Sequence, residues 1–402
     1  MPTNDRQEPF SHPPLPVPHL RRRHWLQWGA GTAAAALLPA AAQSPQSGAA
    51  AAPPTIIQIA DLSRAQQDVS RDFLVGSRTA WQELNARGGL RGRPVRHQVI
   101  EIDGTPASLR NAWQAANEDA TCVALCGCVG NSVAQGLLEL QRDKPPGERA
   151  ATLAQVAPWL QYSAADVGDT TFPIFAGRQA QIAYAIRTLS VVGVSELGVI
   201  YADAQTQADA RAEIAQATAS LGLKTQEFVP AAGGSLATLG RDLPSTAPAM
   251  LLFVGGTPEM IELIRGLRAQ NLWRYLVALA DVNLQVLAQS GIAARGVSVI
   301  ATQAVPMLTA GVPVVRRYRA ALALLFDEPP STLGLAGYIA ARYAAQVLAG
   351  LDAAPTRATA LAAFQRRATM DLGGFVIDYA GGQRSATGVT QGMLATDGRI
   401  VG

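Results

Sequence analysis

Short apolar runs alternate along the chain with stretches in which apolar residues recur every three or four positions. Runs such as 56–60 and 250–254 are typical of buried strands, because a strand covered on both faces carries few polar residues. Between such runs, the spacing of Phe73, Ala80 and Trp81 predicts an amphipathic helix. The repeated strand–helix order predicts parallel sheets with right-handed crossovers.

The expected elements fall into two series, so we predict two doubly wound α/β domains. The expected strands are 56–60, 94–102, 123–125, 151–156, 197–201, 250–254, 276–280 and 297–300. The expected helices are 70–87, 106–118, 132–141, 180–192, 207–221, 257–270, 313–326 and 333–350. A strand-rich tail follows. Residues 144–149 are predicted to form a turn, because two prolines and a glycine cannot continue a helix. Thr257 is predicted to cap its helix, with Pro258 at the first helical position.

Composition agrees with a folded protein that has a sizeable core. Of the 402 residues, 49% are hydrophobic and 16% charged, which excludes disordered and collagen-like chains. No apolar run of about 18 residues follows the first forty positions, so we do not expect the body to span a bilayer. The formal net charge is only +3 and no long basic stripe occurs, which argues against a nucleic-acid partner.

The N-terminal segment has the layout of a secretory signal. Arginines at 22–23 precede a tryptophan and a leucine, and a weakly apolar stretch 28–38 leads to an Ala-x-Ala site ending at Ala42. The arginine pair fits the twin-arginine type of signal. We therefore expect residues 1–42 to be removed, a linker at 43–54 and a periplasmic mature chain. The alternative is an ordinary basic tail.

After the predicted signal peptide, the chain contains few residues suited to catalysis. His97 is the only histidine left, and it alternates with Val95 and Val99 on one face of a predicted strand, which favours a structural role. The chain contains no phosphate-binding or dinucleotide-binding glycine motif after a strand. It also lacks the H-E-x-x-H motif and the G-x-S-x-G elbow. These absences favour a binding protein over an enzyme.

The three cysteines, Cys122, Cys126 and Cys128, lie close together in the sequence. Structural zinc needs four ligands, and no histidine follows nearby, so we do not expect a metal site or any other cofactor. A short-range disulfide, most plausibly with Cys122, is one alternative in the periplasm. Burial as free thiols at a strand end is the other, and we favour it.

Small and polar residues follow the predicted strands. In open parallel sheets, ligands bind beyond the carboxyl ends of the strands, where backbone N–H groups at a helix start hold anionic groups. These stretches are 61–64, 127–132, 155–157, 203–205 and 255–257, together with Asp281. They are also ordinary turn residues. Asp281 is the carboxylate that we expect to meet a ligand ammonium group, the alternative being a cap for the following segment.

The chain resembles the leucine/isoleucine/valine-binding family of periplasmic solute receptors. The resemblance rests on Asp61-Leu62-Ser63, the segment 81–93, Asp103, the loop 127–132, and the segments 255–260, 371–375 and 397–399. It covers nearly all of residues 55–402. It implies a type I periplasmic binding protein of an ABC importer, with two lobes joined by a three-strand hinge. Lobe 1 would be 55–176 plus 302–382, and lobe 2 would be 177–301 plus 383–402.

The resemblance also implies which residues hold the ligand in the cleft between the lobes. The candidates are Ser63, Arg64, Gln66, Gly127, Cys128, Asn131, Ser132, Ala157, Gln205, Gly256 and Asp281. Relatives use an acidic group at Asp281 for the α-ammonium group and polar groups at Asn131 and Ser132 for a carboxylate. Arg64 replaces a usual glycine, and suits a second carboxylate or an aromatic acid unless it is solvated at the rim.

The loops also depart from the family pattern in other ways. The aromatic residues usual near Gln66 and Gln205 are missing, and Val156-Ala157 stands where a hydroxyl is usual. The expected ligand is an amino acid or related small carboxylate, which a monomeric receptor delivers to a membrane permease. A periplasmic sensory protein of the same fold is the alternative. A secreted α/β hydrolase is a third hypothesis and would have to use His97.

Overall fold

The computed structural model describes residues 52–142, 152–159, 168–191, 193–270, 272–292, 297–379 and 388–401. The contacts reported below lie within residues 51–402, which form one unit. The predicted signal peptide, most of the predicted linker and the predicted turn at 144–149 lie outside the described residues.

The first sheet is parallel throughout and has the order β2-β1-β3-β4-β5. Its strands are β1 (Thr55–Asp61), β2 (Arg96–Ile102), β3 (Cys122–Cys126), β4 (Ala154–Val156) and β5 (Thr171–Phe172). The helices between them are α1 (Gln67–Ala86), α2 (Pro106–Glu118) and α3 (Asn131–Arg142). All residues of the central strand β1 are buried, which explains its continuous apolar sequence.

The second sheet has the order β14-β13-β10-β9-β8-β6-β7. Its strands are β6 (Glu196–Tyr201), β7 (Lys224–Phe228), β8 (Met250–Val254), β9 (Arg274–Ala278), β10 (Val297–Gln303), β13 (Thr390–Leu394) and β14 (Ile400–Val401). Its helices are α4 (Arg178–Val191), α5 (Ala204–Ala219), α6 (Leu236–Asp242), α7 (Thr257–Leu267), which continues as the 3₁₀ turn η3 (Arg268–Gln270), and α8 (Leu284–Gln289). Strands β6 to β10 are parallel, and β13 and β14 add antiparallel pairs at one edge.

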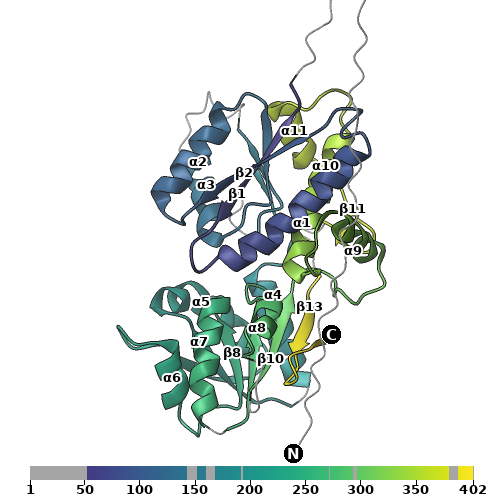
Figure 1. Ribbon diagram of the computed structural model, residues 1–402. Helices are drawn as coiled ribbons and strands as arrows, with labels where there is room; N and C mark the ends of the chain where they lie inside the picture. Colours follow the sequence, from purple (N-terminus) through teal and green to yellow (C-terminus); the bar gives the residue numbers. More distant parts are fainter. Residues whose placement is uncertain are drawn as a thin grey trace, which may run out of the picture. The chain divides into compact units, whose positions relative to one another are not determined.

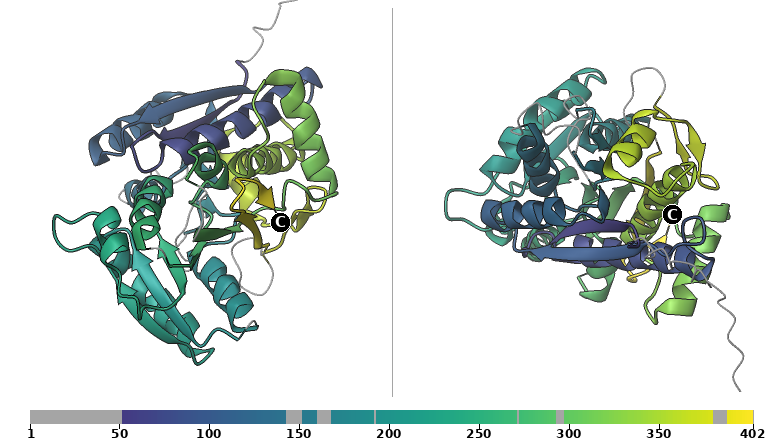
Figure 2. Two further views of the ribbon diagram at one scale, coloured as in Figure 1. Left: turned by 60° about the horizontal axis from the view of Figure 1, so that its bottom comes forward. Right: turned by 90° about the horizontal axis from the view of Figure 1, so that it is seen from above.

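The chain then returns from the second sheet to the first. The returning elements are α9 (Pro313–Leu325), α10 (Thr332–Ala349), α11 (Arg357–Gln365) and the small pair β11 (Met370–Asp371) and β12 (Val376–Ile377). Helix α10 packs along α1, and α11 packs on β3 and β4. Figures 1 and 2 show these light-green and yellow helices beside the purple and blue elements of the first sheet. The chain thus passes three times between the two sheets, and the predicted fold of two doubly wound parallel sheets is confirmed.

The pattern failed to predict some elements. Strand β7 is mostly exposed and polar, so it lacks the apolar run of a buried strand. Helices α6, α8 and α11 have between six and nine residues, too few for a clear helical period. The predicted cap of α7 was wrong by one residue, because Gly256 occupies the cap and Thr257 begins the helix. Among the described residues, no helix has both the length and the apolar sequence that crossing a membrane requires.

Helices α1 and α10 approach each other closely through glycines. A Cβ atom at Gly337 would lie 1.8 Å from the carbonyl oxygen of Phe73. One at Gly76 would lie 1.7 Å from the carbonyl oxygen of Gly334. Neither position therefore accepts a side chain unless the two helices move apart.

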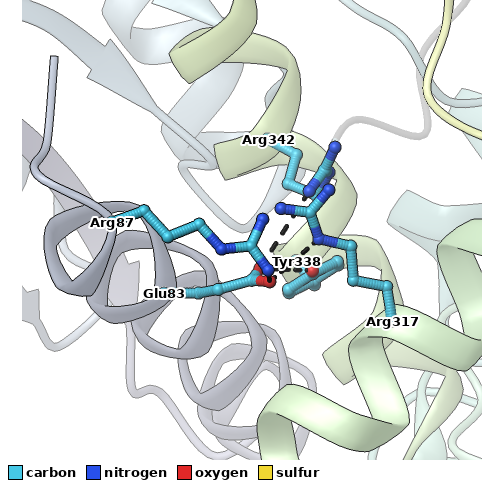
Figure 3. A network of polar contacts seen from close by, with 5 residues as sticks. All are labelled: Glu83, Arg87, Arg317, Tyr338 and Arg342. Atoms are coloured by element: carbon cyan, nitrogen blue, oxygen red, sulfur yellow. Dashed lines mark hydrogen bonds and ion pairs between the residues drawn. The ribbon is translucent and has the colours of Figure 1, made fainter. Parts of the chain in front are cut away.

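A polar network on the same helices surrounds Glu83 (Figure 3). Its Oε1 lies 2.6 Å from Arg87 Nη2 and 2.8 Å from Arg317 Nε, and its Oε2 accepts a 2.6 Å hydrogen bond from the Tyr338 hydroxyl. Arg342 Nη1 lies 4.0 Å from the same Oε2. Because Glu83 is on α1, Arg317 on α9, and Tyr338 and Arg342 on α10, this carboxylate joins three helices.

The cysteine prediction is confirmed in its favoured form. Cys122, Cys126 and Cys128 are all buried free thiols. Burial raises the pKa of Cys122 and of Cys128 to about 12, so these thiols are protonated at neutral pH and poor nucleophiles.

His97 lies on β2, as predicted, and is half-buried. Its Nε2 is 3.1 Å from Gln58 Oε1 on β1, and its ring packs beside Trp81 of α1. Burial and the nearby Arg78 lower the pKa of His97 to about 4, so the ring is neutral at pH 7. These contacts join strand to strand and strand to helix.

Candidate functional site

A cavity of about 700 Å³ lies where the carboxyl ends of strands from both sheets meet. It is lined by the residues after β1, β2, β6, β8 and β9, and by the first turn of α3. This is where open α/β sheets bind ligands, and the volume is in the usual range for small-molecule sites.

Six of the predicted ligand residues line this cavity. They are Ser63, Gln66, Ser132, Gln205, Gly256 and Asp281. The sequence rule that brings them together is simple: each follows a strand or begins the next helix, and parallel strands end at the same edge.

Four of the other predicted residues, Arg64, Gly127, Cys128 and Ala157, do not line the cavity. Arg64 points to solvent, with 83% of its side chain exposed, and its Nη2 lies 3.8 Å from Glu262 Oε1. Gly127, Cys128 and Ala157 are buried. Residue Asn131 begins α3, but its side chain is outside the described part of the structure.

Gly127, Cys128 and Ala157 are buried because backbone hydrogen bonding between neighbouring segments continues past the ends of β3 and β4. The backbone N–H of Trp159 donates a 2.8 Å hydrogen bond to the carbonyl of Cys128. The N–H of Ala157 donates a 2.9 Å bond to Phe172. Gly127 has φ +65° and a Cβ there would lie 2.8 Å from the Phe73 ring, so this loop packs inward.

Asp281 accepts a hydrogen bond from a tryptophan that follows β4 of the first sheet. The indole Nε1 of Trp159 donates a 2.9 Å hydrogen bond to Asp281 Oδ1. The alternative prediction, a cap for the segment after Asp281, is wrong. The cap of α8 is Asn283, whose Oδ1 accepts hydrogen bonds from the N–H groups of Gln285 and Val286.

Sequence reasoning did not single out most of the acidic residues of the cavity. Besides Asp281, its lining contains Asp61, Asp103, Asp203, Asp209 and Glu259. Asp61 and Asp203 belong to stretches that follow predicted strands, which was the available signal. Asp61 also accepts a hydrogen bond from the backbone N–H of Ser63, and Asp203 one from that of Thr206. Each carboxylate therefore also stabilises the turn in which it lies.

Of the described residues that line the cavity, one is cationic, Arg178. Its Nε lies 2.6 Å from Glu213 Oε2, and its Nη2 donates a 2.7 Å hydrogen bond to the carbonyl of Asp209. This guanidinium is therefore already paired. Within the described residues, no three of the His, Cys, Asp and Glu side chains are grouped so that they could hold a metal ion.

Acidic residues of α1 also meet the helices of the second sheet. Asp72 Oδ2 accepts a 2.9 Å hydrogen bond from Asn283 Nδ2. Asp68 lies beside Thr257, and both of its carboxylate oxygens are buried without a hydrogen-bond partner among the described residues. Burial raises the pKa of Asp68 and of Asp72.

Comparison with known proteins identifies the family. A family model described as periplasmic binding protein matches residues 55–402. No curated protein matches this chain in sequence.

Solved structures show the same fold. An extracellular ligand-binding receptor from Verminephrobacter eiseniae is 21% identical, with a TM-score of 0.76 over 87% of this chain and 100% of that one. A leucine-binding protein from Thermotoga maritima is 14% identical, with a TM-score of 0.71 over 86% and 97%. An ABC transporter substrate-binding protein from Desulfitobacterium hafniense, in complex with Leu, is 16% identical, with a TM-score of 0.66 over 87% and 99%.

Proposed function

Because the chain belongs to the periplasmic binding protein family, we propose that it is the extracytoplasmic receptor of an ABC importer. It captures a small solute in the 700 Å³ cavity and delivers it to a membrane permease. The observation that carries this proposal is the position of the cavity, which is lined by strand ends of both sheets. The paired or buried state of Arg178, His97 and the three thiols supports binding without catalysis.

An amino acid or related small carboxylate is the proposed class of ligand. The Asp281 carboxylate would accept the α-ammonium group, and Ser132 with the first N–H groups of α3 would hold the carboxylate. Neighbours in structure that are described as leucine-binding, or that were solved with Leu, support this class.

Capture is proposed to proceed by closure about the three passages of chain between the sheets, with lobe boundaries as expected from the sequence. Two hydrogen bonds, Trp159 to Asp281 and Asn283 to Asp72, already join the elements of one sheet to those of the other. A ligand that touches both groups of loops binds the closed arrangement more tightly and shifts the population toward it. The receptor is proposed to act as a monomer in the periplasm after removal of residues 1–42.

The test is a thermal-shift screen of the purified protein against amino acids, aromatic acids and dicarboxylates. A ligand that binds only the folded form raises Tm according to its concentration and Kd. For an amine-bearing ligand, Asp281→Asn should weaken binding at least tenfold, because it removes the charge. The asparagine keeps an oxygen for Trp159, so the unliganded Tm should stay near that of the unmodified protein.

The matched control is Asp397→Asn, which changes an exposed aspartate that pairs only with its neighbour Arg399 among the described residues. It should leave ligand affinity unchanged. Unchanged affinity in Asp281→Asn would show that this carboxylate does not face the ligand. Uptake of the same compound by cells with and without the chain then distinguishes import from sensing.

A further inference from the structure

The charge of the cavity lining is strongly one-sided. Of the described residues that line it, six are carboxylates, and the one guanidinium already pairs with Glu213. Both sheets contribute, since Asp61 ends β1 and Asp103 follows β2 in the first sheet, whereas Asp203, Glu259 and Asp281 belong to the second. Like charges around one cavity repel one another, and a cation between them reduces that repulsion.

Two of these carboxylates are buried wholly or in part and form no ion pair among the described residues. Asp61 is 2% exposed, and within the described residues only its Oδ1 accepts a hydrogen bond, from the N–H of Ser63. Its Oδ2 lies near the loops that contain Gly104 and Gly130. Glu259 Oε2 is buried without a hydrogen-bond partner in the described structure. A buried carboxylate without a counter-ion is costly, so these two groups favour a cation that arrives with the ligand.

The arrangement does not suit a single metal ion. A divalent cation requires several oxygen ligands at one point, and no such group of side chains occurs among the described residues. Carboxylates on separate elements around one cavity instead match a molecule with separate ammonium or guanidinium groups.

We propose that the ligand is an organic cation with two or more ammonium or guanidinium groups, which Asp61 and Glu259 bind in addition to Asp281. This proposal rests on the receptor function proposed above and narrows its ligand class. Basic amino acids and polyamines share the required chemistry. Branched-chain amino acids lack the second cationic group. Dicarboxylates would meet the acidic lining without the one residue predicted to receive them, because Arg64 lies outside the cavity.

The test uses pairs of compounds that differ in charge and little in shape. Arginine is compared with citrulline, and lysine with norleucine, by isothermal titration of the purified protein. Putrescine and spermidine form the polyamine arm, and leucine and glutamate complete the set. We expect one of the cationic compounds to bind at least tenfold more tightly than any neutral or acidic one. Raising NaCl from 20 to 500 mM should weaken that binding severalfold.

Variants then test which carboxylates bind the cationic ligand. Asp61→Asn keeps an oxygen for the N–H of Ser63 and removes the charge, so the fold should be retained. It should lower the affinity for the cation at least tenfold and leave the affinity for a neutral isostere within twofold. Glu259→Gln should do the same. Glu196→Gln is the matched control, because Glu196 is exposed at the first position of β6, at the opposite end of the strands from the cavity. It should change neither affinity.

The outcomes separate this inference from the receptor function. If leucine, norleucine or glutamate binds as tightly as every cationic compound, the inference is overturned and the receptor function stands. A loss in Asp61→Asn that is equal for charged and neutral compounds would also overturn it. Binding of polyamines without amino acids would support the cation and reject the amino-acid class. If no compound of any class binds, the receptor function and this inference fail together.

Discussion

Glu83 holds a negative charge at a position that is only 13% exposed, where a tyrosine hydroxyl and three guanidinium groups surround it. Removing the carboxylate would leave Arg342, which is itself 20% exposed, without its nearest anion. A buried charge or hydroxyl that loses its partner costs more than the original pair contributed. We therefore predict that Glu83→Ala lowers the free energy of unfolding by about 3 kcal/mol, measured by urea denaturation.

The matched change is Arg87→Ala, which removes a partner that is 59% exposed. An exposed ion pair contributes little, so this variant should lose no more than about 1 kcal/mol. Equal losses in Glu83→Ala and Arg87→Ala would contradict the view that the buried members of the network carry its stabilising effect.

The lowered pKa of His97 predicts that the stability of the protein depends on pH. Burial and Arg78 lower its pKa from 6.5 to about 4, so the folded ring resists protonation while the unfolded ring accepts it. The stability that the neutral ring contributes is present above pH 6.5 and is lost as the pH falls through about 4. Between pH 7 and pH 4, we expect the unmodified protein to lose roughly 1–3 kcal/mol more than His97→Gln, measured by urea denaturation at each pH. The difference between the two proteins isolates His97 from other titrating groups. Parallel curves would contradict the lowered pKa.

At the scale of residues, the sequence predicts where a polar side chain follows a strand but not which way it points. Ser63 and Arg64 are neighbours in one loop, yet Ser63 lines the cavity and Arg64 is in solvent beside Glu262. Cys128 and Ala157 follow strands as predicted, but extra backbone pairing beyond β3 and β4 keeps them buried. Such pairing depends on partners far along the chain, so no local pattern reports it.

At the scale of elements, the crossing of α1 and α10 depends on the absence of side chains. The Gly337→Ala substitution would bring its Cβ within 1.8 Å of the Phe73 carbonyl oxygen, which is backbone and cannot rotate away. The helices must separate, and core contacts around them are lost. We predict a loss of about 3 kcal/mol or more in the free energy of unfolding, or failure to fold.

Gly350→Ala is the control for this crossing. Gly350 caps the same helix with φ −76°, and a Cβ there would lie 3.4 Å from its nearest neighbour, the carbonyl oxygen of Val347. Thermal unfolding of this variant should differ from that of the unmodified protein by no more than the effect of an ordinary surface change, about 0.5 kcal/mol. A Gly337→Ala protein as stable as Gly350→Ala would show that the two helices have room to adjust.

Elements with a buried face were predictable, and exposed or short ones were not. The strand at 250–254 and the helix at 106–118 were predicted with their observed bounds, because burial imposes a clear apolar period on each. Strand β7 is an edge strand with polar side chains, so its sequence resembles a loop. The pairing of β13 with β10 joins segments about ninety residues apart, and only the assembled sheet fixes it.

At the scale of the whole molecule, the binding cavity is a consequence of topology. The loops that line it come from strands more than two hundred residues apart, and they meet because both parallel sheets present their carboxyl ends to the same space. The sequence therefore predicts most of the loops that meet, although the predicted segment 155–157 is buried and does not line the cavity. It does not predict how the acidic groups of α1 face those of α7, since that depends on how the helices of one sheet meet those of the other.

A substitution at Asp68 tests how the helices of the first sheet contact those of the second. It lies on α1, beside Thr257 of α7, and like charges at Asp72 and Glu259 act on the same region. Burial is the main cause that raises the pKa of Asp68, and it outweighs the Thr257 side chain and the N–H groups at the start of α1, which lower that pKa. A neutral residue of the same shape avoids this cost. We predict that Asp68→Asn raises the free energy of unfolding by about 1 kcal/mol at pH 7.

The pH dependence of stability expected from Asp68 is opposite in sign to that expected from His97. The carboxyl of Asp68 takes up a proton more readily in the folded protein, so the unmodified protein regains stability as the pH falls through the raised pKa of Asp68. The advantage of Asp68→Asn should therefore shrink below pH 7 and vanish near 3.8, the unfolded value, in urea denaturation at a series of pH values. The exposed Asp327→Asn should show no advantage at any pH. An advantage of Asp68→Asn that persisted unchanged to pH 3.8 would mean that shape, and not the buried charge between the two sets of helices, is responsible.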